Sequence, residues 1–427
     1  MHPQASTPAQ RIVTIDILRG TALLGILLAH FIYWYTGGPL PQEVYTKNYG
    51  IGSNIVAGIH NVLIFGKFYA FFAFLFGVSF NLQLSALEKA GTNVNIRFLR
   101  RLLILFLIGT VHHYFWMGDI LSIYASLGIS LLLFRFLNDK GLLIWGIVFA
   151  LAIPNKTWDA VNFLWIKWEP GNPFGNAAQA YYDVVKSGSL WEVLRFNGSQ
   201  LSSKASFQLL GGRASTTIGF FLLGMWAGRK GILDGTPEMR GPLRKILQKS
   251  GMYAGIMVLV AATIFGLNEL LKLGWQENPI VGFFFGIVFD TFNAALVMVY
   301  ATGIALLLYR PFWNWLFSPL NFIGKVALTS YLTQTVAGLL LFYHFGAGLF
   351  LKTTPATNYL MAFIIFTMQV FLAKWWLRYF YYGPVEWLWR SATIGKWQSF
   401  RRITQRPRRQ ALRLLLNAVR SGDVAKK

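Results

Sequence analysis

The sequence predicts an all-α fold, a polytopic bundle of about ten transmembrane helices. The composition is 55% hydrophobic and only 13% charged, whereas a soluble domain carries about 25% charged residues. Apolar runs long enough to cross a bilayer recur along the whole chain, and basic residues gather between those runs. Lipid is therefore the expected solvent for most of the chain.

Ten stretches are candidates for the membrane-spanning helices. A helix that crosses the hydrocarbon core needs about 20 mainly apolar residues. The fifth stretch is the shortest, and the eighth is long enough to tilt. The expected spans are 12–35, 59–82, 98–116, 120–136, 142–153, 207–227, 252–271, 280–308, 326–345 and 359–382.

The placement of Lys and Arg predicts the orientation of the bundle. Basic residues of short loops stay on the cytosolic side of a membrane. With both termini in the cytosol, every inner connection carries basic residues, and an odd number of spans would put a basic cluster outside. The inner basic stretches are 97–101, 135–140, 229–249, 310–325 and 390–427.

The bundle is expected to occupy residues 1–382, followed by a basic segment at 383–427. Within the bundle, 155–206 is predicted to be an extracytoplasmic loop with a short helix near 177–186. Apolar residues at helical spacing within 412–419 predict an amphipathic cytosolic helix on the inner leaflet. A disordered basic tail is the alternative.

Charge and motifs exclude several classes of protein. A formal net charge of +23 would suggest nucleic acid for a soluble protein. Here the basic clusters flank apolar runs, so anionic lipid of the inner leaflet is the expected partner and nucleic acid is not. The chain has no cysteine, hence no disulfide or thiol nucleophile. It also lacks a Walker loop, an HExxH metal motif and a G-x-S-x-G elbow with triad partners.

Ionisable residues inside the apolar runs are the candidate functional residues. A charge at membrane depth costs about 2.5–3.5 kcal/mol on insertion scales, so such residues are functional-site hypotheses by default. The predicted topology puts most of them near the outer leaflet, which predicts a polar cavity there, whereas Asp16 and Arg19 lie near the cytosolic end. The candidates for catalysis are His112 and Asp119, and those for substrate binding are Asp16, Arg19, His30, His60, Lys67, His113, Arg213, Asp290, Asn293, Glu386 and Arg390.

Each candidate also has a structural interpretation. Asp16 and Arg19, three residues apart, can form a clamp that locks helix packing. His112 and His113 can belong to the interfacial belt, and Lys67 can snorkel to the surface. Asp290 needs a partner, for which Arg213 and Lys67 are the candidates. The hydroxyl-rich run 329–335 more often joins helices than binds a ligand.

Six blocks, spread in order over nearly the whole chain, carry a family resemblance. Together they resemble the YeiB-like bacterial membrane proteins, a family defined by a domain of unknown function, DUF418. The blocks are DILRGTALLGI at 16–26, GKFY with FLFG at 66–77, His112 with GDIL at 118–121, LLGM at 222–225, ALTSYL at 327–332 and GPVEWLWR at 383–390.

The resemblance implies a multi-pass protein of the bacterial inner membrane. The family's fold is similar to that of the transmembrane acyltransferases, which include the heparan-alpha-glucosaminide N-acetyltransferase group and the acyltransferase-three proteins. The likeness rests on the Asp-x-x-Arg-Gly opening, and a fold does not fix a function. Relatives usually place Asn where this chain has His30, and the histidine used by the N-acetyltransferase group has no counterpart at or near Leu40. Its catalytic residue therefore cannot be carried over, and His112 is the expected base.

The first expected function is acyl-CoA-dependent O- or N-acyl transfer to an envelope or lipid-linked acceptor. His112 would act as general base, with Asp119 orienting it if the turn at 117–118 brings the two together. Arginines at the inner face, Arg19 with the cluster 97–101, would hold the phosphates of the donor. The distance is a difficulty, because Asp16 and His30 already lie about 21 Å apart along a helix.

Two functions of other classes stay open. One is transport or flipping of a small or lipid-linked substrate, with Asp290, Lys67 and Asp119 binding the substrate or relaying protons. No inverted repeat is visible in the sequence, which disfavours the commonest secondary transporters. The other is a membrane scaffold for an envelope complex.

Overall fold

The computed structural model describes residues 12–36, 40, 50–166, 177–272 and 279–402. A helix lies at each of the ten predicted positions, and the all-helical prediction is confirmed. The predicted amphipathic helix at 412–419 lies outside the described residues. The helices are α1 (Val13–Ala29), α3 (Ile51–Ile59), α4 (Phe68–Lys89), α5 (Val94–Phe115), α6 (Leu121–Phe134), α7 (Asp139–Ala150), α8 (Ile153–Val161), α9 (Ala177–Ser187), α10 (Leu190–Ser199), α11 (Leu201–Leu210), α12 (Arg213–Arg229), α13 (Arg240–Leu271), α14 (Pro279–Leu307), α15 (Pro311–Phe317), α16 (Leu320–Lys325), α17 (Ala327–Phe342), α18 (Pro355–Tyr379) and α19 (Pro384–Ile394), with π-helical turns η1 (His30–Trp34) and η2 (His60–Ile64) continuing α1 and α3.

Several of these helices have the length and composition of membrane spans. Within the described residues, five qualify: Val13–Trp34, Ile51–Lys89, Pro237–Leu271, Val281–Leu307 and Pro355–Tyr379. α7 and α8 together pass the same test as a sixth, bent by 50°, and α6 and α17 are apolar but shorter. These helices support a membrane protein, whereas the count of ten spans and the cytosolic placement of both termini stay predictions.

The second predicted span is not one continuous helix. The chain breaks between η2 and α4, where Gly66 adopts a φ of +79°, a left-handed conformation that favours glycine. The Nζ of Lys67 turns back and donates to the carbonyl of Asn61 at 3.1 Å, which satisfies a carbonyl that the end of the helix leaves without a partner. Lys67 is 0% exposed, so the snorkelling interpretation is wrong.

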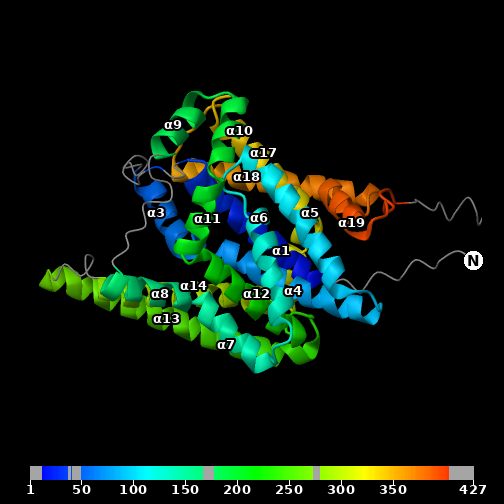
Figure 1. Ribbon diagram of the computed structural model, residues 1–427, viewed down its shortest axis with the longest axis horizontal. Coiled ribbons are helices and arrows are strands. Elements are labelled where there is room, and N and C mark those ends of the chain that lie inside the picture. The colour runs from blue at the N-terminus through cyan, green and yellow to red at the C-terminus, as the bar shows by residue number, and fades with distance from the viewer. Residues whose placement is uncertain (1–11, 37–39, 41–49, 167–176, 273–278, 403–427) are drawn as a thin grey trace, which may run out of the picture.

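The predicted loop at 155–206 is largely helical where the structure describes it. α9 confirms the short helix expected near 177–186. α10 begins with a capping box in which Ser189 and Glu192 satisfy each other's backbone N–H groups, a signal that was present in the sequence and was not read. α9 and α10 cover the upper end of the molecule in Figure 1, and α19 lies at the right. These are called the α9 end and the α19 end below.

Glycines let the central helices approach each other closely. A Cβ on Gly77 of α4 would clash with the carbonyl of Phe221 on α12, and a Cβ on Gly224 of α12 would clash with the carbonyl of Phe74 on α4. The two glycines are therefore reciprocal, and their crossing brings backbone against backbone, as small residues do in membrane helix pairs.

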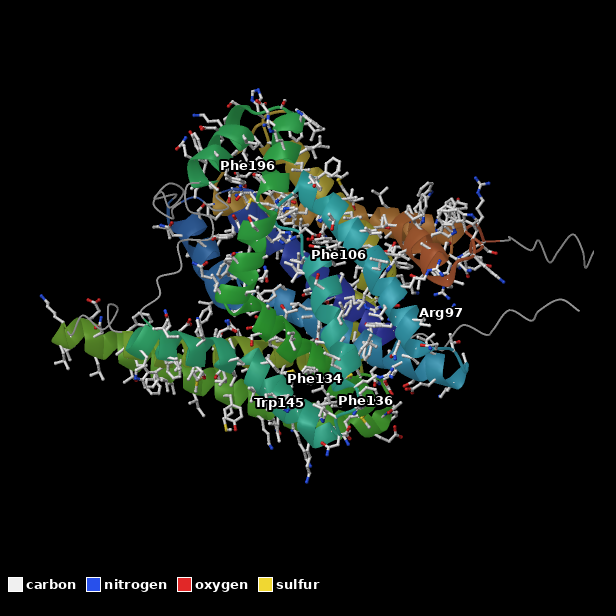
Figure 2. The ribbon with its side chains drawn as sticks, in the orientation of Figure 1. Arg97, Phe106, Phe134, Phe136, Trp145 and Phe196 are labelled. Carbon is white, nitrogen blue, oxygen red and sulfur yellow. The ribbon has the colours of Figure 1, made fainter. Side chains whose placement is uncertain are left out.

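Large apolar side chains cover the outside of the bundle. Leu133 is 71% exposed and Phe136 is 78% exposed; Phe136 is labelled in Figure 2. α13 and α14 form a hairpin along the lower edge (Figure 1), and only 11% of the apolar window of each is buried. A surface of this kind is stable in lipid and not in water.

Replacing Gly224 with Val is expected to destabilise the fold, because the α4–α12 crossing has no room for a side chain. Overpacking of this kind typically costs about 1–3 kcal/mol. The measurement is the thermal unfolding temperature of the purified protein in detergent. Gly255→Val on α13 is the control, since a Cβ there meets nothing within 4 Å; equal losses in the two variants would refute the role of the crossing.

Candidate functional site

His112 and Asp119 are in contact, as the turn between their helices allows. His112 lies in the last turn of α5, and its Nδ1 is 2.9 Å from Oδ1 of Asp119. The carboxylate of Asp119 also accepts from the backbone N–H groups of Leu121 at 3.0 Å and Ser122 at 3.1 Å. Asp119 thus caps the start of α6 and holds the imidazole with the same group.

Lys204 of α11 completes the surroundings of this carboxylate. Its Nζ donates to Oδ2 of Asp119 at 3.0 Å and to Oγ of Ser122 at 2.9 Å, and lies 3.3 Å from Nδ1 of His113. Burial alone would raise the pKa of Asp119, but the Lys204 ammonium and the His112 hydrogen bond hold that pKa below its usual range. The carboxylate is therefore ionised, and Nδ1 of His112 is the proton donor to it.

A hydroxyl group lies on the other side of the imidazole. Nε2 of His112 is 2.8 Å from Oγ1 of Thr335 on α17. Because Nδ1–H donates to Asp119, Nε2 carries the lone pair and the Thr335 hydroxyl donates to it. Both ring nitrogens are thus engaged in a buried chain of hydroxyl, imidazole and carboxylate, which we call the Thr335–His112–Asp119 chain.

Two cavities lie next to each other beside this chain. The Asp119 cavity, about 70 Å³, is lined by His30, Asp119, Lys204 and Arg213. The α14 cavity, about 780 Å³, lies between α8, α12 and α14. Phe65, Gly66, Tyr69, Phe207 and Arg213 line both cavities. The two chambers bring together the candidates His30, Asp119, Arg213, Asp290 and Asn293, whereas their position near the outer leaflet stays a prediction.

Asp290 and Asn293 line the α14 cavity. Arg213 and Lys67 were the predicted partners of Asp290, and this prediction is wrong. The carboxylate of Asp290 instead accepts from Nζ of Lys156 on α8, a residue that had been assigned to the outer loop. Lys67 packs over the rings of Phe289 and Phe292 at 5.6 and 5.5 Å and lines neither cavity.

A third cavity, the α19-side cavity, also lies beside this chain. It measures about 170 Å³ and is lined by Arg19, Arg101, Lys325 and Trp389, with Tyr331 and Ile120 among its other walls. It shares Ile26 and Ile120 with the Asp119 cavity. The ring of Tyr331, which lines this cavity, lies 5.1 Å from that of His112. Asp119, which lines the other cavity, contacts the same imidazole. His112 itself lines neither cavity and lies behind these two residues.

The remaining candidates are held in contacts of their own. Asp16 pairs with Arg19 at 2.8 Å, as their spacing predicted. His60 contacts the hydroxyl of Tyr359 at 3.1 Å, and His113 donates to the carbonyl of Asn197 at 2.8 Å. Glu386 accepts from the backbone N–H groups of Leu328 and Thr329, at 2.6 and 2.9 Å, and so caps α17. Arg390 lies over the ring of Tyr382 at 5.2 Å.

The described part of the chain has no group of three or more His, Asp or Glu residues that could hold a metal ion. The buried carboxylates are each occupied by a lysine, an arginine or the end of a helix instead.

Comparison with known proteins finds one family model and several relatives that resemble this chain. Residues 227–396 match the family model described as "Protein of unknown function (DUF418)". The uncharacterised protein YxaH of Bacillus subtilis is 28% identical over 94% of this chain and 99% of its own length. The uncharacterised protein YeiB of Escherichia coli is 27% identical over 90% of this chain and 97% of its own length. The chain is therefore similar to the DUF418 family over residues 227–396 and to YxaH and YeiB over most of its length. No solved structure matches it.

The DUF418 model covers only one side of the site. Thr335, Asp290 and Arg390 lie within the matched residues, while His112 and Asp119 precede them. YxaH and YeiB align with most of this protein. The resemblance therefore extends to residues on both sides of the Thr335–His112–Asp119 chain.

The sequence did not predict three polar residues of this site. Thr335 was assigned to helix packing, and Lys204 and Lys156 were assigned to a loop. A hydroxyl residue such as Thr335 is recognised as part of a site only when its partner is known, because hydroxyl groups in apolar helices usually bond to their own backbone. The two lysines gave a weak signal, since a basic residue in a polar segment is ordinarily solvated.

Replacing Asp119 with Ala is expected to destabilise the protein strongly. The variant leaves Lys204 buried without its anion and removes the cap of α6; breaking a buried ion pair typically costs about 3–5 kcal/mol. Thermal unfolding in detergent measures the loss. Asp139→Ala is the control, because its pair with Lys230 at 2.7 Å is on the surface, with the side chains 40% and 50% exposed, and exposed pairs contribute little. A similar unfolding temperature for both variants would contradict the role given to Asp119.

Proposed function

We propose that this protein is a membrane acyltransferase that modifies an envelope or lipid-linked acceptor, with His112 as its base. The Thr335–His112–Asp119 chain is the observation that supports this function. A hydroxyl at 2.8 Å from one imidazole nitrogen, with a carboxylate at 2.9 Å from the other, is the geometry that activates an oxygen nucleophile for acyl transfer.

The proposed reaction has two halves. The hydroxyl of Thr335 attacks the thioester carbonyl of an acyl-CoA while His112 takes its proton. The carbon–sulfur bond breaks, and His112 returns the proton to the departing thiolate, leaving CoA thiol and an acyl ester on Thr335. A hydroxyl or amine of the acceptor then loses its proton to His112 and attacks this ester, which restores the Thr335 hydroxyl.

An ester on Thr335 removes the distance problem posed by the sequence. A donor entering from the α19 end and an acceptor bound at the α9 side would never have to meet. The side chain of Tyr331, one helical turn before Thr335, lines the α19-side cavity, and that of Asp119 lines the cavity of the other side. The acyl group would be held in the layer between them.

Arg101 supports a donor site in the α19-side cavity. Its guanidinium stacks on Trp389 at 3.8 Å, and no carboxylate or other acceptor within the described residues binds it. Five N–H donors without an acceptor form a site for a phosphate of the donor. Of the other arginines expected to bind phosphate, Arg19 lines this cavity, whereas Arg97 and Arg100 do not.

Transport is the second candidate function. The break between η2 and α4 supports it, because transporters form their substrate sites at interrupted helices, and Gly66 of this break lines two of the cavities. A transporter would move its substrate into liposomes without any acyl donor.

His112→Ala is expected to abolish acyl transfer, because among the described residues His112 is the base that contacts Thr335. The assay follows radiolabel from acyl-CoA into the lipid and envelope fractions of membranes that contain the protein. His60→Ala is the control, since His60 contacts Tyr359 and takes no part in the Thr335–His112–Asp119 chain; it should retain the incorporation. Wild-type incorporation in His112→Ala membranes would exclude His112 as the base, and no incorporation by the wild type with any acyl-CoA, together with uptake in liposomes, would favour transport.

Thr335→Val is expected to block formation of the acyl ester while preserving the size of the side chain, and Thr335→Ser is expected to retain it. Intact-protein mass spectrometry after incubation with acyl-CoA, with no acceptor added, should detect one added acyl group in the wild type and in Thr335→Ser. The adduct should be released by hydroxylamine and map to α17. Transfer at the wild-type rate by Thr335→Val would mean that the acceptor attacks the donor directly, with His112 still as base.

A further inference from the structure

The α14 cavity contains a guanidinium that no acid neutralises. Arg213 lines both this cavity and the Asp119 cavity. Its guanidinium lies 4.3 Å from the ring of Tyr69 and 5.3 Å from that of Phe207. Within the described residues, no hydrogen-bond acceptor and no carboxylate contacts it. The aromatic rings favour the cation, but they leave its N–H groups free for an oxyanion.

Asp290, one of the two acids that line the cavity, is held by another cation. Asp290 binds Lys156, and Nζ of Lys156 also donates to the carbonyl of Leu151 at 2.9 Å. Asp159 lies three residues beyond Lys156 on α8, so it shares the same face of that helix. The positive charge of Arg213 therefore remains available, and its position as the first residue of α12 adds the positive end of the helix dipole.

A second polar group in this cavity lacks a partner. Asn293 is 8% exposed, lines the cavity, and its amide oxygen is buried without a hydrogen bond. Buried amide oxygens are normally satisfied. The cavity thus offers unused donors, on Arg213, and one unused acceptor, the amide oxygen of Asn293.

The rest of the cavity wall is apolar and reaches the outer surface of the bundle. Phe283, Phe284 and Phe289 of α14 line it, and Phe284 and Phe289 are 59% and 42% exposed. Gly282 beside them leaves open space where a side chain would project. α14 belongs to the hairpin at the edge of the bundle, so a ligand that enters past these rings comes from the surface on which we expect lipid.

We infer that the α14 cavity binds an amphiphile with an oxyanion head, in which a phosphate lies on the guanidinium of Arg213 and the apolar chain lies along Phe283, Phe284 and Phe289. The amphiphile would be the acceptor of the acyl group, or the lipid that carries the acceptor. This assignment rests on the proposed acyl transfer. Binding itself requires no acyl transfer.

Dodecyl phosphate tests the inference with the full-length protein in dodecyl maltoside micelles. The detergent has the same chain with an uncharged head, so the phosphate is the difference under test. Saturable binding of radiolabelled dodecyl phosphate, about one per protein, is the expected result. Arg213→Gln should weaken it by about tenfold or more, because charge-assisted contacts to an oxyanion are lost.

Two further variants separate the head from the chain. Gly282→Leu fills the apolar part without touching Arg213 and should also weaken binding. Arg195→Gln makes the same chemical change as Arg213→Gln at an exposed site on α10 and should bind as the wild type does. Unfolding temperatures identify any variant that fails to fold; for Arg213→Gln, Arg213→Lys then takes its place, with a smaller expected loss.

Three results would overturn the inference: unchanged binding by Arg213→Gln, unchanged binding by Gly282→Leu, or displacement of the label by inorganic phosphate as readily as by dodecyl phosphate. The last result would assign the site to a free anion. Acyl-ester formation on Thr335 is measured in parallel. If the wild type binds dodecyl phosphate but forms no ester, the proposed reaction fails while the binding site stands.

Discussion

The carboxylate of Asp119 is the group on which the arrangement of the site depends. It caps α6, pairs with Lys204 of α11 and fixes the proton of His112 on Nδ1. A buried carboxylate is unfavourable unless its oxygens are satisfied, so these contacts are required together. The consequence reaches Thr335, because only the tautomer that Asp119 selects leaves Nε2 free to accept its hydroxyl.

Arg101 and Arg213 extend this arrangement to both ends of the bundle. Each guanidinium rests on aromatic rings and lines a cavity. A cation that is partly withdrawn from water without an anion costs free energy, which the binding of an oxyanion would recover. Because one such cation lies on each side of the Thr335–His112–Asp119 chain, the charges fit two anionic substrates better than one.

The sequence predicted contacts between residues that are close together along the chain and missed contacts between residues that are far apart along it. Apolar length predicted the helices, three-residue spacing predicted Asp16 with Arg19, and the turn after α5 allowed His112 to meet Asp119. The partners Lys204, Thr335 and Lys156 come from helices whose packing no local pattern encodes. For Asp290, the free-energy cost of a charge at membrane depth predicted that a partner exists, but it did not predict which cation is that partner.

The break between η2 and α4 shows why irregular backbone occurs at this place. Inside a membrane, backbone that departs from a helix is tolerated only where protein buries it or it lines a cavity. Both conditions hold here: Gly66 lines the Asp119 and α14 cavities, and Lys67 covers the carbonyl of Asn61. The left-handed conformation of Gly66, which favours glycine, thus lies where the two chambers meet, within the Gly-Lys block that carries the family resemblance.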